Sequence, residues 1–375
     1  MNRFDMKNVS KSRVLVTRFP LEARVGGEEM HTLSLMQGLD KRGVEAIFLG
    51  SCPVLRNMFK MSGFEARRAW LGPAPVTRLG VIGFTLLWPV LFLLAGWQLW
   101  QARKRWGVNV LYCLSFGEKL VMTPWARLFG MKILWLEHAR IGAWLARNPW
   151  RWVYGFFSRW VTVVVTSNAM VPHARKFARN VLAVPCGVIV DKVGRLPDKI
   201  VDFLKGGFAV GTVARLTVDK GVDMIVKLVH NKPDVRVVIV GKGPLRKKLE
   251  KLAGGRKQVM IFDSLPREQL VALYRVLDLF VLGSREMDPF GMVAAEAMWQ
   301  GTPTVVTDAC GIAADLMHER DAYIIRPKFA ELDRAVKKLS RQKSLLERIG
   351  QGGQKFAKKN YALERVVDSF EDLLS

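Results

Sequence analysis

The chain has 375 residues, of which 50% are hydrophobic and 24% are charged. This length accommodates two domains with separate cores, and the composition excludes an intrinsically disordered protein. The formal net charge of +25 is unusually high, so an anionic partner is expected.

The positive charge and the tryptophans are concentrated in the first half of the chain. Residues 1–185 hold 26 Lys and Arg against 9 Asp and Glu, whereas residues 186–375 hold 32 against 24. Of the 12 tryptophans, only Trp299 follows residue 160. Indole rings with basic side chains are typical of a surface that meets an anionic membrane. A nucleic acid is the other partner of basic faces. We expect the membrane and no nucleic acid.

The cysteines and the first residues indicate the compartment. Cys52, Cys113, Cys186 and Cys310 are far apart and form no C-x-x-C pair, so we expect neither a zinc site nor a disulfide framework. Residues 1–12 are polar and lack the apolar stretch of a signal peptide. These features predict a protein of the reducing cytoplasm.

In the first half, short apolar runs alternate with helical patterns. A helix over 28–42, ending at Gly43, follows the first expected strand. The expected strands are Val14–Thr17, Glu45–Leu49, Val108–Cys113, Lys132–Leu136 and Val161–Val165.

An uncharged apolar stretch, residues 79–100, interrupts this pattern and is flanked by Arg78 and by basic residues at 103–105. Its length is that of a membrane span. Pro89 lies near its centre, and basic residues at both ends give no orientation. A span would also place strands of one sheet on opposite sides of the bilayer. We favour a membrane-associating segment 79–102 that lies in the interface or forms a shallow hairpin, over a buried helix or a true span.

The second half alternates strands and helices more regularly. Helices are expected over 222–229 and 244–253, from Pro266, over Met292–Met298 and at the end of the chain, over Ala362–Leu374. The expected strands are Phe208–Val213, Val235–Val240, Val259–Phe262, Leu279–Leu282 and Thr304–Thr307.

This alternation predicts an α/β protein with two doubly wound, Rossmann-like domains that face each other across a cleft. The expected division is 1–186 for the first domain, 187–357 for the second, and 358–375 for a C-terminal helix. The hinge is expected near 186–207, which contains several glycines. Ligands of such sheets bind beyond the carboxyl ends of the strands.

Three segments at expected strand ends carry candidate chemistry. Gly26-Gly27 opens the first helix and would let a phosphate approach the backbone, although most such pairs are only turns. Arg215 and Lys220 follow the strand that ends at Val213 and would flank a diphosphate, or else form a solvated basic loop. Glu296 interrupts the apolar helix 292–298, where a carboxylate needs hydrogen-bond partners.

Missing motifs exclude other classes. The chain has no G-x-x-x-x-G-K-[ST] sequence, so it is not a P-loop enzyme. Gly241-Lys242-Gly243-Pro244 is only a fragment of a dinucleotide fingerprint, which argues against an oxidoreductase. No Asp-x-Asp is present to hold a divalent ion on a diphosphate, so Arg215 and Lys220 would supply that charge.

Together, these segments resemble the family 4 retaining glycosyltransferases, which have the GT-B fold. The resemblance is strong over 208–310, fair over 12–50 and weak over 51–180. The matching motifs are Gly26-Gly27-Glu28-Glu29-Met30-His31, Arg42-Gly43-Val44-Glu45, Arg215-Leu216 with Lys220-Gly221, Gly241-Lys242-Gly243-Pro244, and Asp288 to Glu296 with its continuation to Pro303. Asp288 replaces the first Glu of the family signature, and Glu286 lies nearby.

The resemblance implies a role for each matching residue. Gly26, Gly27, Gly241 and Gly243 would contact the donor, Arg215 and Lys220 would neutralise its diphosphate, and Glu296 would bind the ribose. Asp288 and the backbone of Phe290-Gly291 would hold the transferred sugar. His138 follows an expected strand where the family often has a histidine beside the sugar, although a lone histidine is as often structural. The final helix would cross back to the first domain.

The function that follows is a metal-independent, retaining hexosyltransferase without a cofactor. It would use a UDP- or GDP-linked sugar and act on a lipid-linked, glycolipid or polysaccharide acceptor of the cell envelope, at the inner face of the cell membrane, with the acceptor on the first domain. A soluble-acceptor enzyme or a nucleotide-sugar epimerase is one alternative. An inactive, glycosyltransferase-like membrane scaffold is the other.

Overall fold

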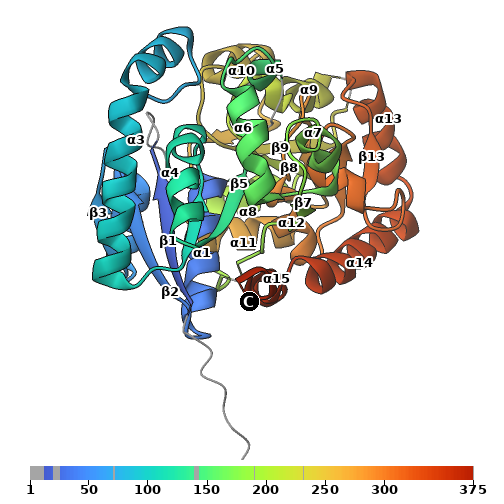
Figure 1. Cartoon of the computed structure of the whole chain (residues 1–375). Coiled ribbons are helices and arrows are strands. Elements are labelled where there is room, and N and C mark those ends of the chain that lie inside the picture. The colour runs from blue at the N-terminus through green and yellow to red at the C-terminus, as the bar shows by residue number, and fades with distance from the viewer. Residues whose placement is uncertain are drawn as a thin grey trace, which may run out of the picture. The chain divides into compact units, whose positions relative to one another are not determined.

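The computed structural model describes residues 12–19, 26–70, 72–138, 143–189, 191–230 and 232–374. They divide into two compact units, and Figure 1 labels most of their helices and strands. Unit 1 comprises the described residues within 12–165, 171–184 and 366–374, and unit 2 those within 166–170 and 185–365. Residues 1–11, on which the expectation of no signal peptide rests, lie outside the described residues.

Unit 1 is built on a parallel sheet with the strand order β3-β2-β1-β4-β5-β6-β7. Its strands are β1 (Arg13–Arg18), β2 (Glu45–Gly50), β3 (Glu65–Arg68), β4 (Val110–Cys113), β5 (Lys132–Glu137), β6 (Thr162–Val165) and β7 (Val181–Ala183). Its helices are α1 (Gly27–Asp40), α2 (Pro53–Met61), α3 (Arg78–Trp106), α4 (Phe116–Leu128), α5 (Ala143–Ala146), α6 (Arg151–Phe157), α7 (Val171–Ala174) and α15 (Leu363–Leu374), of which α15 begins in unit 2.

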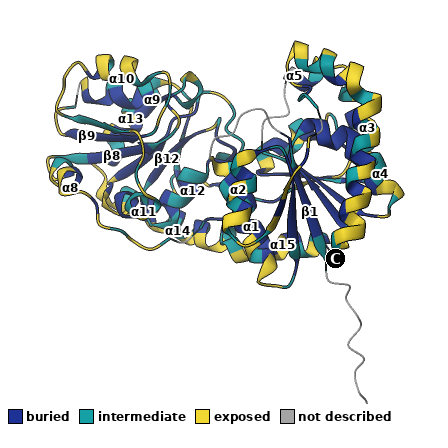
Figure 2. Ribbon diagram, turned by 90° about the vertical axis from the view of Figure 1, so that its left-hand side faces the viewer, coloured by how far each residue is buried: buried dark blue, intermediate teal, exposed yellow. Residues whose placement is uncertain are grey.

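Helices cover both faces of this sheet, which explains why its central strands are continuous apolar runs. Val14, Leu15 and Val16 of β1 are fully buried. Helices α1 and α2 pack together on one face, whereas α3 and α4 pack together on the other face (Figure 2), and α6 packs against α4. The chain therefore reverses its winding between β1 and β4, which are neighbours in the sheet.

The apolar segment forms one continuous helix, α3, and not a hairpin. Thr77 caps its start by accepting a hydrogen bond from the Gly80 N–H at 3.0 Å, and Gly107 ends it with a left-handed φ of 65°. Pro89 lies inside without breaking it. By length and composition α3 could cross a membrane. However, it joins β3 to β4 of the same sheet, which a span could not do.

The end of the chain completes unit 1. Val366, Val367 and Phe370 of α15 are at most 2% exposed, and Val367 packs against Gly38 of α1 so closely that a Cβ there would lie 2.4 Å away. Arg42 forms ion pairs with Asp368 at 2.5 Å and with Glu371 at 2.6 Å. Packing and charge thus both attach the last helix to α1.

Unit 2 is built on a second parallel sheet, with the order β10-β9-β8-β11-β12-β13. Its strands are β8 (Phe208–Val213), β9 (Val235–Val240), β10 (Val259–Phe262), β11 (Leu279–Leu282), β12 (Thr304–Thr307) and β13 (Tyr323–Ile325). Its helices are α8 (Asp198–Leu204), α9 (Val222–Lys227), α10 (Arg246–Ala253), α11 (Arg267–Val276), α12 (Met292–Trp299), α13 (Phe329–Leu339) and α14 (Lys343–Asn360).

Two buried apolar clusters lie on the two faces of this sheet. One contains Ala294 and Met298 of α12, and the other contains Val222 and Ile225 of α9. The expected fold class, two doubly wound α/β sheets, is confirmed. Every expected strand is present, whereas β3, β7 and β13 were not predicted.

Candidate functional site

The candidate residues of unit 2 lie where its sheet changes winding. Strands β8 and β11 are neighbours, but α9 leads from β8 toward one edge of the sheet and α12 leads from β11 toward the other. The carboxyl ends of such a strand pair are the usual ligand site of doubly wound sheets. Arg215 and Lys220 follow β8, and Asp288 follows β11.

Lys220 and Asp288 form an ion pair at this point. Their Nζ and Oδ2 atoms are 2.5 Å apart, and the side chains are only 15% and 13% exposed. Ser284 Oγ donates to the same carboxylate oxygen at 3.3 Å. An ammonium group has three N–H donors, so Lys220 can hold a second anion while it keeps Asp288. The structure thus brings two of the predicted residues into direct contact.

Gly221 explains how the two loops come together. It has a left-handed φ of 62°, and a Cβ there would lie 2.1 Å from the Gly283 carbonyl oxygen. A side chain at this position would push the loop after β8 away from the loop after β11. The glycine that follows Lys220 is therefore needed for the Lys220–Asp288 pair.

Arg215 lies in the same loop but projects into solvent. Its side chain is 72% exposed, and its guanidinium is 3.7 Å from the Asp219 carboxylate. Exposed pairs of this length contribute little stability. The guanidinium can therefore move to a ligand at small cost.

Gly241 and Gly243 have a structural role in unit 2. A Cβ at Gly241 would lie 1.8 Å from the Ala214 carbonyl oxygen, and one at Gly243 would lie 2.4 Å from that of Leu216. The Leu216 N–H donates to the Lys242 carbonyl at 2.8 Å. The two glycines therefore support the loop that carries Arg215, and their contact with a donor stays a prediction.

Helix α12 presents its N-terminus beside Asp288. The Phe290 side chain is 3% exposed and packs against Tyr361, so only its backbone can meet a ligand. Gly291 precedes the helix with a φ of 103°. Within the described residues, the N–H groups of Phe290 and Gly291 donate to no acceptor. Free N–H groups at a helix start favour an anion or a hydroxyl oxygen.

Glu296 has partners inside the protein. The Tyr274 hydroxyl donates to Glu296 Oε2 at 3.1 Å, and the Arg267 guanidinium lies 3.4 Å from Oε1. Burial raises the pKa of the Glu296 carboxyl, and Arg267 offsets part of that rise. The expectation that a carboxylate here needs partners is confirmed, but the partners present come from α11. A role in binding ribose stays a prediction.

The candidate residues of unit 1 also lie at strand ends. Gly26 caps α1, and its N–H donates to the Glu29 carboxylate at 3.0 Å. Arg18, at the end of β1, pairs with Glu29 at 2.6 Å and with Glu28 at 3.3 Å. Gly26 and Gly27 are exposed. The N-terminus of α1 is therefore open, and Arg18 compensates the two carboxylates in its first turn.

His138 follows β5 and faces His31 of α1. The two rings are 5.4 Å apart, and burial lowers the pKa of each histidine to about 3. His31 Nδ1 and His138 Nε2 are buried without a hydrogen-bond partner among the described residues. Both imidazoles are therefore neutral near pH 7 and can exchange hydrogen bonds with a hydroxyl group. His138 was predicted from the sequence as a site residue. His31 was not, although it is the last residue of the Gly26–His31 motif.

A buried charged network that was not predicted from the sequence lies beside these histidines. Lys119 Nζ lies 2.6 Å from both the Leu136 carbonyl oxygen and Glu137 Oε1, and the Tyr154 hydroxyl donates to that carboxylate oxygen at 2.8 Å. Glu118 Oε1 accepts from the Leu114 and Ser115 N–H groups and from Thr17. Two charges in the apolar stretch 116–126 were the available signal, of the same kind that identified Glu296.

We predict that replacing Glu118 by glutamine removes a pH dependence of stability. Burial raises the pKa of Glu118 to about 7, whereas an unfolded chain has the ordinary value near 4.5. The folded state therefore binds the proton more tightly. Lowering the pH from 8 to 5 then stabilises the wild type relative to Glu118→Gln, by at most about 1.4 kcal/mol per pH unit between the two pKa values.

Denaturant unfolding of both proteins at several pH values measures this difference. The histidines titrate in both proteins, so their contribution cancels. A difference that stays constant with pH would contradict the prediction.

Among residues 12–374 that the structure describes, no group of three or more His, Cys, Asp or Glu side chains is placed to hold a metal ion. The four cysteines are all buried.

Comparison with known proteins gives matches to glycosyltransferases. Residues 198–356 match the sequence model of the family described as "Glycosyl transferases group 1". The chain is 30% identical over 165 residues to an alpha-D-kanosaminyltransferase of Streptomyces kanamyceticus, covering 42% of each chain. It is 36% identical over 110 residues to a GDP-mannose-dependent alpha-mannosyltransferase of Corynebacterium glutamicum, covering 29% of this chain and 25% of the relative. The matches span about a third of the length of the first curated relatives.

Solved structures extend the likeness to nearly the whole chain. The Anabaena protein HepE in complex with UDP has a TM-score of 0.78 at 16% identity, covering 97% of this chain and 99% of that one. A glycosyltransferase from Rickettsia africae has a TM-score of 0.78 at 16% identity, covering 97% and 98%. The expected GT-B fold is confirmed. The predicted resemblance to glycosyltransferases is confirmed as well, and the matched residues 198–356 lie within unit 2.

Proposed function

We propose that this chain is a retaining hexosyltransferase that uses a UDP- or GDP-linked sugar, a membrane-associated acceptor and no metal ion. The acceptor would be a lipid-linked sugar, a glycolipid or a polysaccharide. The observation that carries the proposal is the Lys220–Asp288 pair at the carboxyl ends of β8 and β11, beside the free N–H groups that precede α12.

The pair and the helix start suit a diphosphate leaving group. When the bond to the sugar breaks, negative charge grows on the departing phosphate oxygen. The Lys220 side chain is largely buried and is held in place by Asp288. A fixed cation in such an environment stabilises this charge more than water does. Arg215 adds a second cation by moving in from solvent. These two residues would do the work of a metal ion.

Asp288 and His138 suit the sugar. The Asp288 carboxylate would accept a hydrogen bond from a hydroxyl of the hexose, and the Phe290 and Gly291 N–H groups would donate to another. His138 is neutral, so its free Nε2 would bond a sugar hydroxyl without repelling a developing positive charge on the ring.

Retention requires no protein nucleophile in this proposal. The acceptor oxygen would bond to the anomeric carbon on the face from which the diphosphate leaves. The proton of the acceptor hydroxyl would pass to the leaving phosphate oxygen. Atoms and charge then balance between the two substrates, and the protein supplies position and electrostatic stabilisation.

The first half of the chain supports a membrane acceptor. Residues 1–185 hold the larger part of the net charge and 11 of the 12 tryptophans. Helix α3 presents exposed apolar side chains. The protein would act as a peripheral enzyme on the inner face of the cell membrane.

A donor screen tests the proposed function. Purified protein is incubated with UDP- and GDP-sugars, with and without a bacterial lipid extract and with and without EDTA, and nucleotide release is measured. We expect release with one donor class, stimulation by lipid, an α- or β-linked product with the configuration of the donor, and no effect of EDTA. Equal turnover without lipid would favour a soluble acceptor or an epimerase. No release from any donor would favour the inactive scaffold.

A further inference from the structure

The surface of α3 carries an unpartnered apolar stripe. Leu79, Ile82, Leu86, Val90, Leu93 and Trp97 follow one another at spacings of three or four residues, and each is 54–83% exposed. This spacing places them along one face of the helix. The opposite face, with Phe84, Leu91 and Leu99, is buried against unit 1. A helix of 29 residues is about 43 Å long. The stripe is therefore a contiguous apolar patch and differs from the single exposed apolar residues that are normal on a protein surface.

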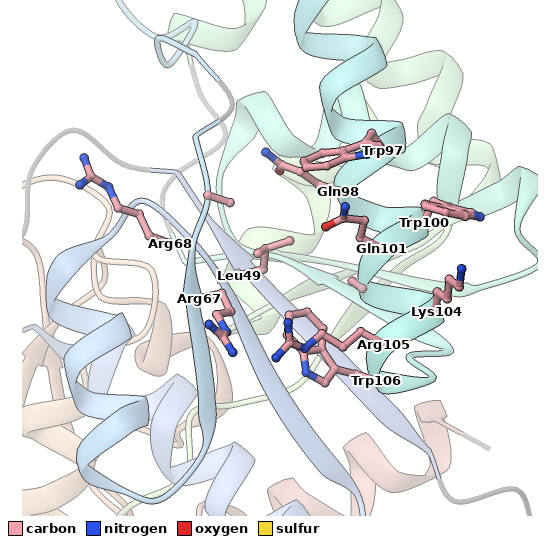
Figure 3. A pocket seen from close by; sticks show the side chains of 12 residues that line it. Leu49, Arg67, Arg68, Trp97, Gln98, Trp100, Gln101, Lys104, Arg105 and Trp106 are labelled. Carbon is pink, nitrogen blue, oxygen red and sulfur yellow. The ribbon is translucent and has the colours of Figure 1, made fainter.

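The stripe ends at a groove between α3 and the edge strand β3. The groove has a volume of about 670 Å³, and no carboxylate is among the described residues that line it. Arg67 of β3 and Arg105 of α3 extend into it from opposite sides, and Trp97 and Gln101 lie above them (Figure 3). Arg68 and Lys104 also belong to its rim and point outward.

The four cations of the groove outnumber the carboxylates near them, which are Asp40, Glu45 and Glu65 in a neighbouring hollow that Arg105 also lines. Arg67 Nε is bonded to Glu65 at 2.7 Å, on the exposed strand. Within the described residues, Arg68, Lys104 and Arg105 form no ion pair, and their nearest described partners include aromatic rings: Lys104 over Trp100 and Arg105 over Trp106. Like charges that converge on one groove favour an anion between them.

We propose that this groove binds the phosphate headgroup of an anionic membrane phospholipid while the apolar stripe of α3 enters the bilayer interface. The proposal rests on the membrane acceptor of the proposed function and identifies the surface that reaches it. The stripe would enter to the depth of the acyl-chain boundary, and the groove, one or two turns further along the helix, would stay at headgroup level. Trp97 joins the two regions, as indole rings do at a membrane interface.

Charge decides between this occupant and the others. A second copy of the chain would bring a half with 26 Lys and Arg against 9 Asp and Glu to the same cations, so the two would repel. A nucleic acid would meet the cations but leave the apolar stripe in water. Only an anionic lipid surface matches both the stripe and the groove.

Vesicle binding tests the proposal. Wild type is compared with a groove variant, Arg67→Gln/Arg105→Gln, and with a stripe variant, Leu86→Ser/Leu93→Ser. The matched control is Arg334→Gln/Arg341→Gln, which removes the same charge from exposed positions of unit 2. With vesicles that contain phosphatidylglycerol, the groove variant is expected to bind about 30-fold more weakly, since each cation near such a surface contributes about fivefold. The stripe variant should bind less to every vesicle, and the control should bind nearly as wild type does.

Vesicles that carry the same surface potential through oleate separate a phosphate site from diffuse attraction. We expect wild type to prefer phosphatidylglycerol to oleate and the groove variant to lose that preference. Equal binding of wild type to the two lipids would overturn the phosphate groove. The same would follow if the unit 2 control lost as much vesicle binding as the groove variant. Light scattering without lipid tests the second copy: a dimer that Leu86→Ser/Leu93→Ser dissociates would overturn the membrane assignment.

Nucleotide release from the donor in detergent distinguishes this inference from the proposed function. The groove variant should retain that reaction, whereas Lys220→Ala should bind vesicles and lack it. Vesicle binding without any sugar transfer would leave the groove standing and refute the enzyme. Sugar transfer by a protein that shows no preference for phosphatidylglycerol would support the enzyme and refute the phosphate groove.

Discussion

Replacing Lys220 by alanine is expected to lower kcat for sugar transfer at least about 100-fold, because the variant lacks the cation that meets the leaving diphosphate. Lys220 is the part of the site that the structure fixes most firmly, through Asp288 at 2.5 Å and the close approach at Gly221. Removing it also leaves the Asp288 carboxylate to repel the diphosphate. This repulsion raises KM for the donor, whereas the missing stabilisation of the charge that grows on the departing diphosphate lowers kcat, and we expect the effect on kcat to be the larger. Steady-state rates of nucleotide release measure both.

Two further variants make this experiment specific. Lys205→Ala removes an exposed lysine of the same unit, which pairs with the exposed Asp202 at 3.0 Å, and should leave the rate unchanged. Lys220→Arg keeps the charge with a different shape and should recover part of the activity. If Lys220→Ala were as active as Lys205→Ala, the diphosphate would not lie at this strand pair.

Replacing Lys119 by methionine is expected to lower the free energy of unfolding of unit 1 by about 3 kcal/mol. Lys119 is 1% exposed, and without its ammonium group the Glu137 carboxylate and the Leu136 carbonyl oxygen lose their shared donor. Removing one partner of a buried pair is more destabilising than replacing both, because an uncompensated charge remains. Denaturant unfolding followed by tryptophan fluorescence measures the effect, since 11 of the 12 tryptophans lie before residue 161.

The double variant Lys119→Met/Glu137→Gln should be more stable than Lys119→Met alone, because no charge is then left unpaired. Lys132→Met, at the exposed start of the same strand β5, is the matched control and should change stability by less than about 0.5 kcal/mol. A Lys119→Met protein as stable as this control would show that the pair does not hold β5 and α4 together.

Much of the fold could be predicted because buried parallel strands have a simple sequence pattern. Strand β9, Val235–Val240, consists of β-branched residues apart from Arg236, and its other five residues are buried, so it was predicted from its sequence alone. The strand β3, Glu65–Arg68, was not predicted. It lies at the edge of its sheet with only Ala66 buried, so its residues show no apolar run.

The residues of the candidate site could be predicted motif by motif, but the contacts between different motifs could not. Lys220 and Asp288 are 68 residues apart in different motifs, and they meet because β8 and β11 are neighbours in the sheet, which the sequence analysis did not predict. The partners of Glu296 could not be predicted, because Arg267 and Tyr274 are ordinary residues of the amphipathic helix α11. The groove between β3 and α3 was also out of reach, since the edge strand that forms one wall had not been predicted.

The attachment of α15 to α1 has a consequence for synthesis on the ribosome. Val367 and Phe370, which are covered by the first unit, are translated after all of residues 185–365. The half of the protein that leaves the ribosome first is thus the last to complete its core. A gene fragment that ends at residue 186 would encode a product whose apolar surface beside Gly38 is uncovered. Helix α15 would then have to be added as a peptide or fused to that fragment.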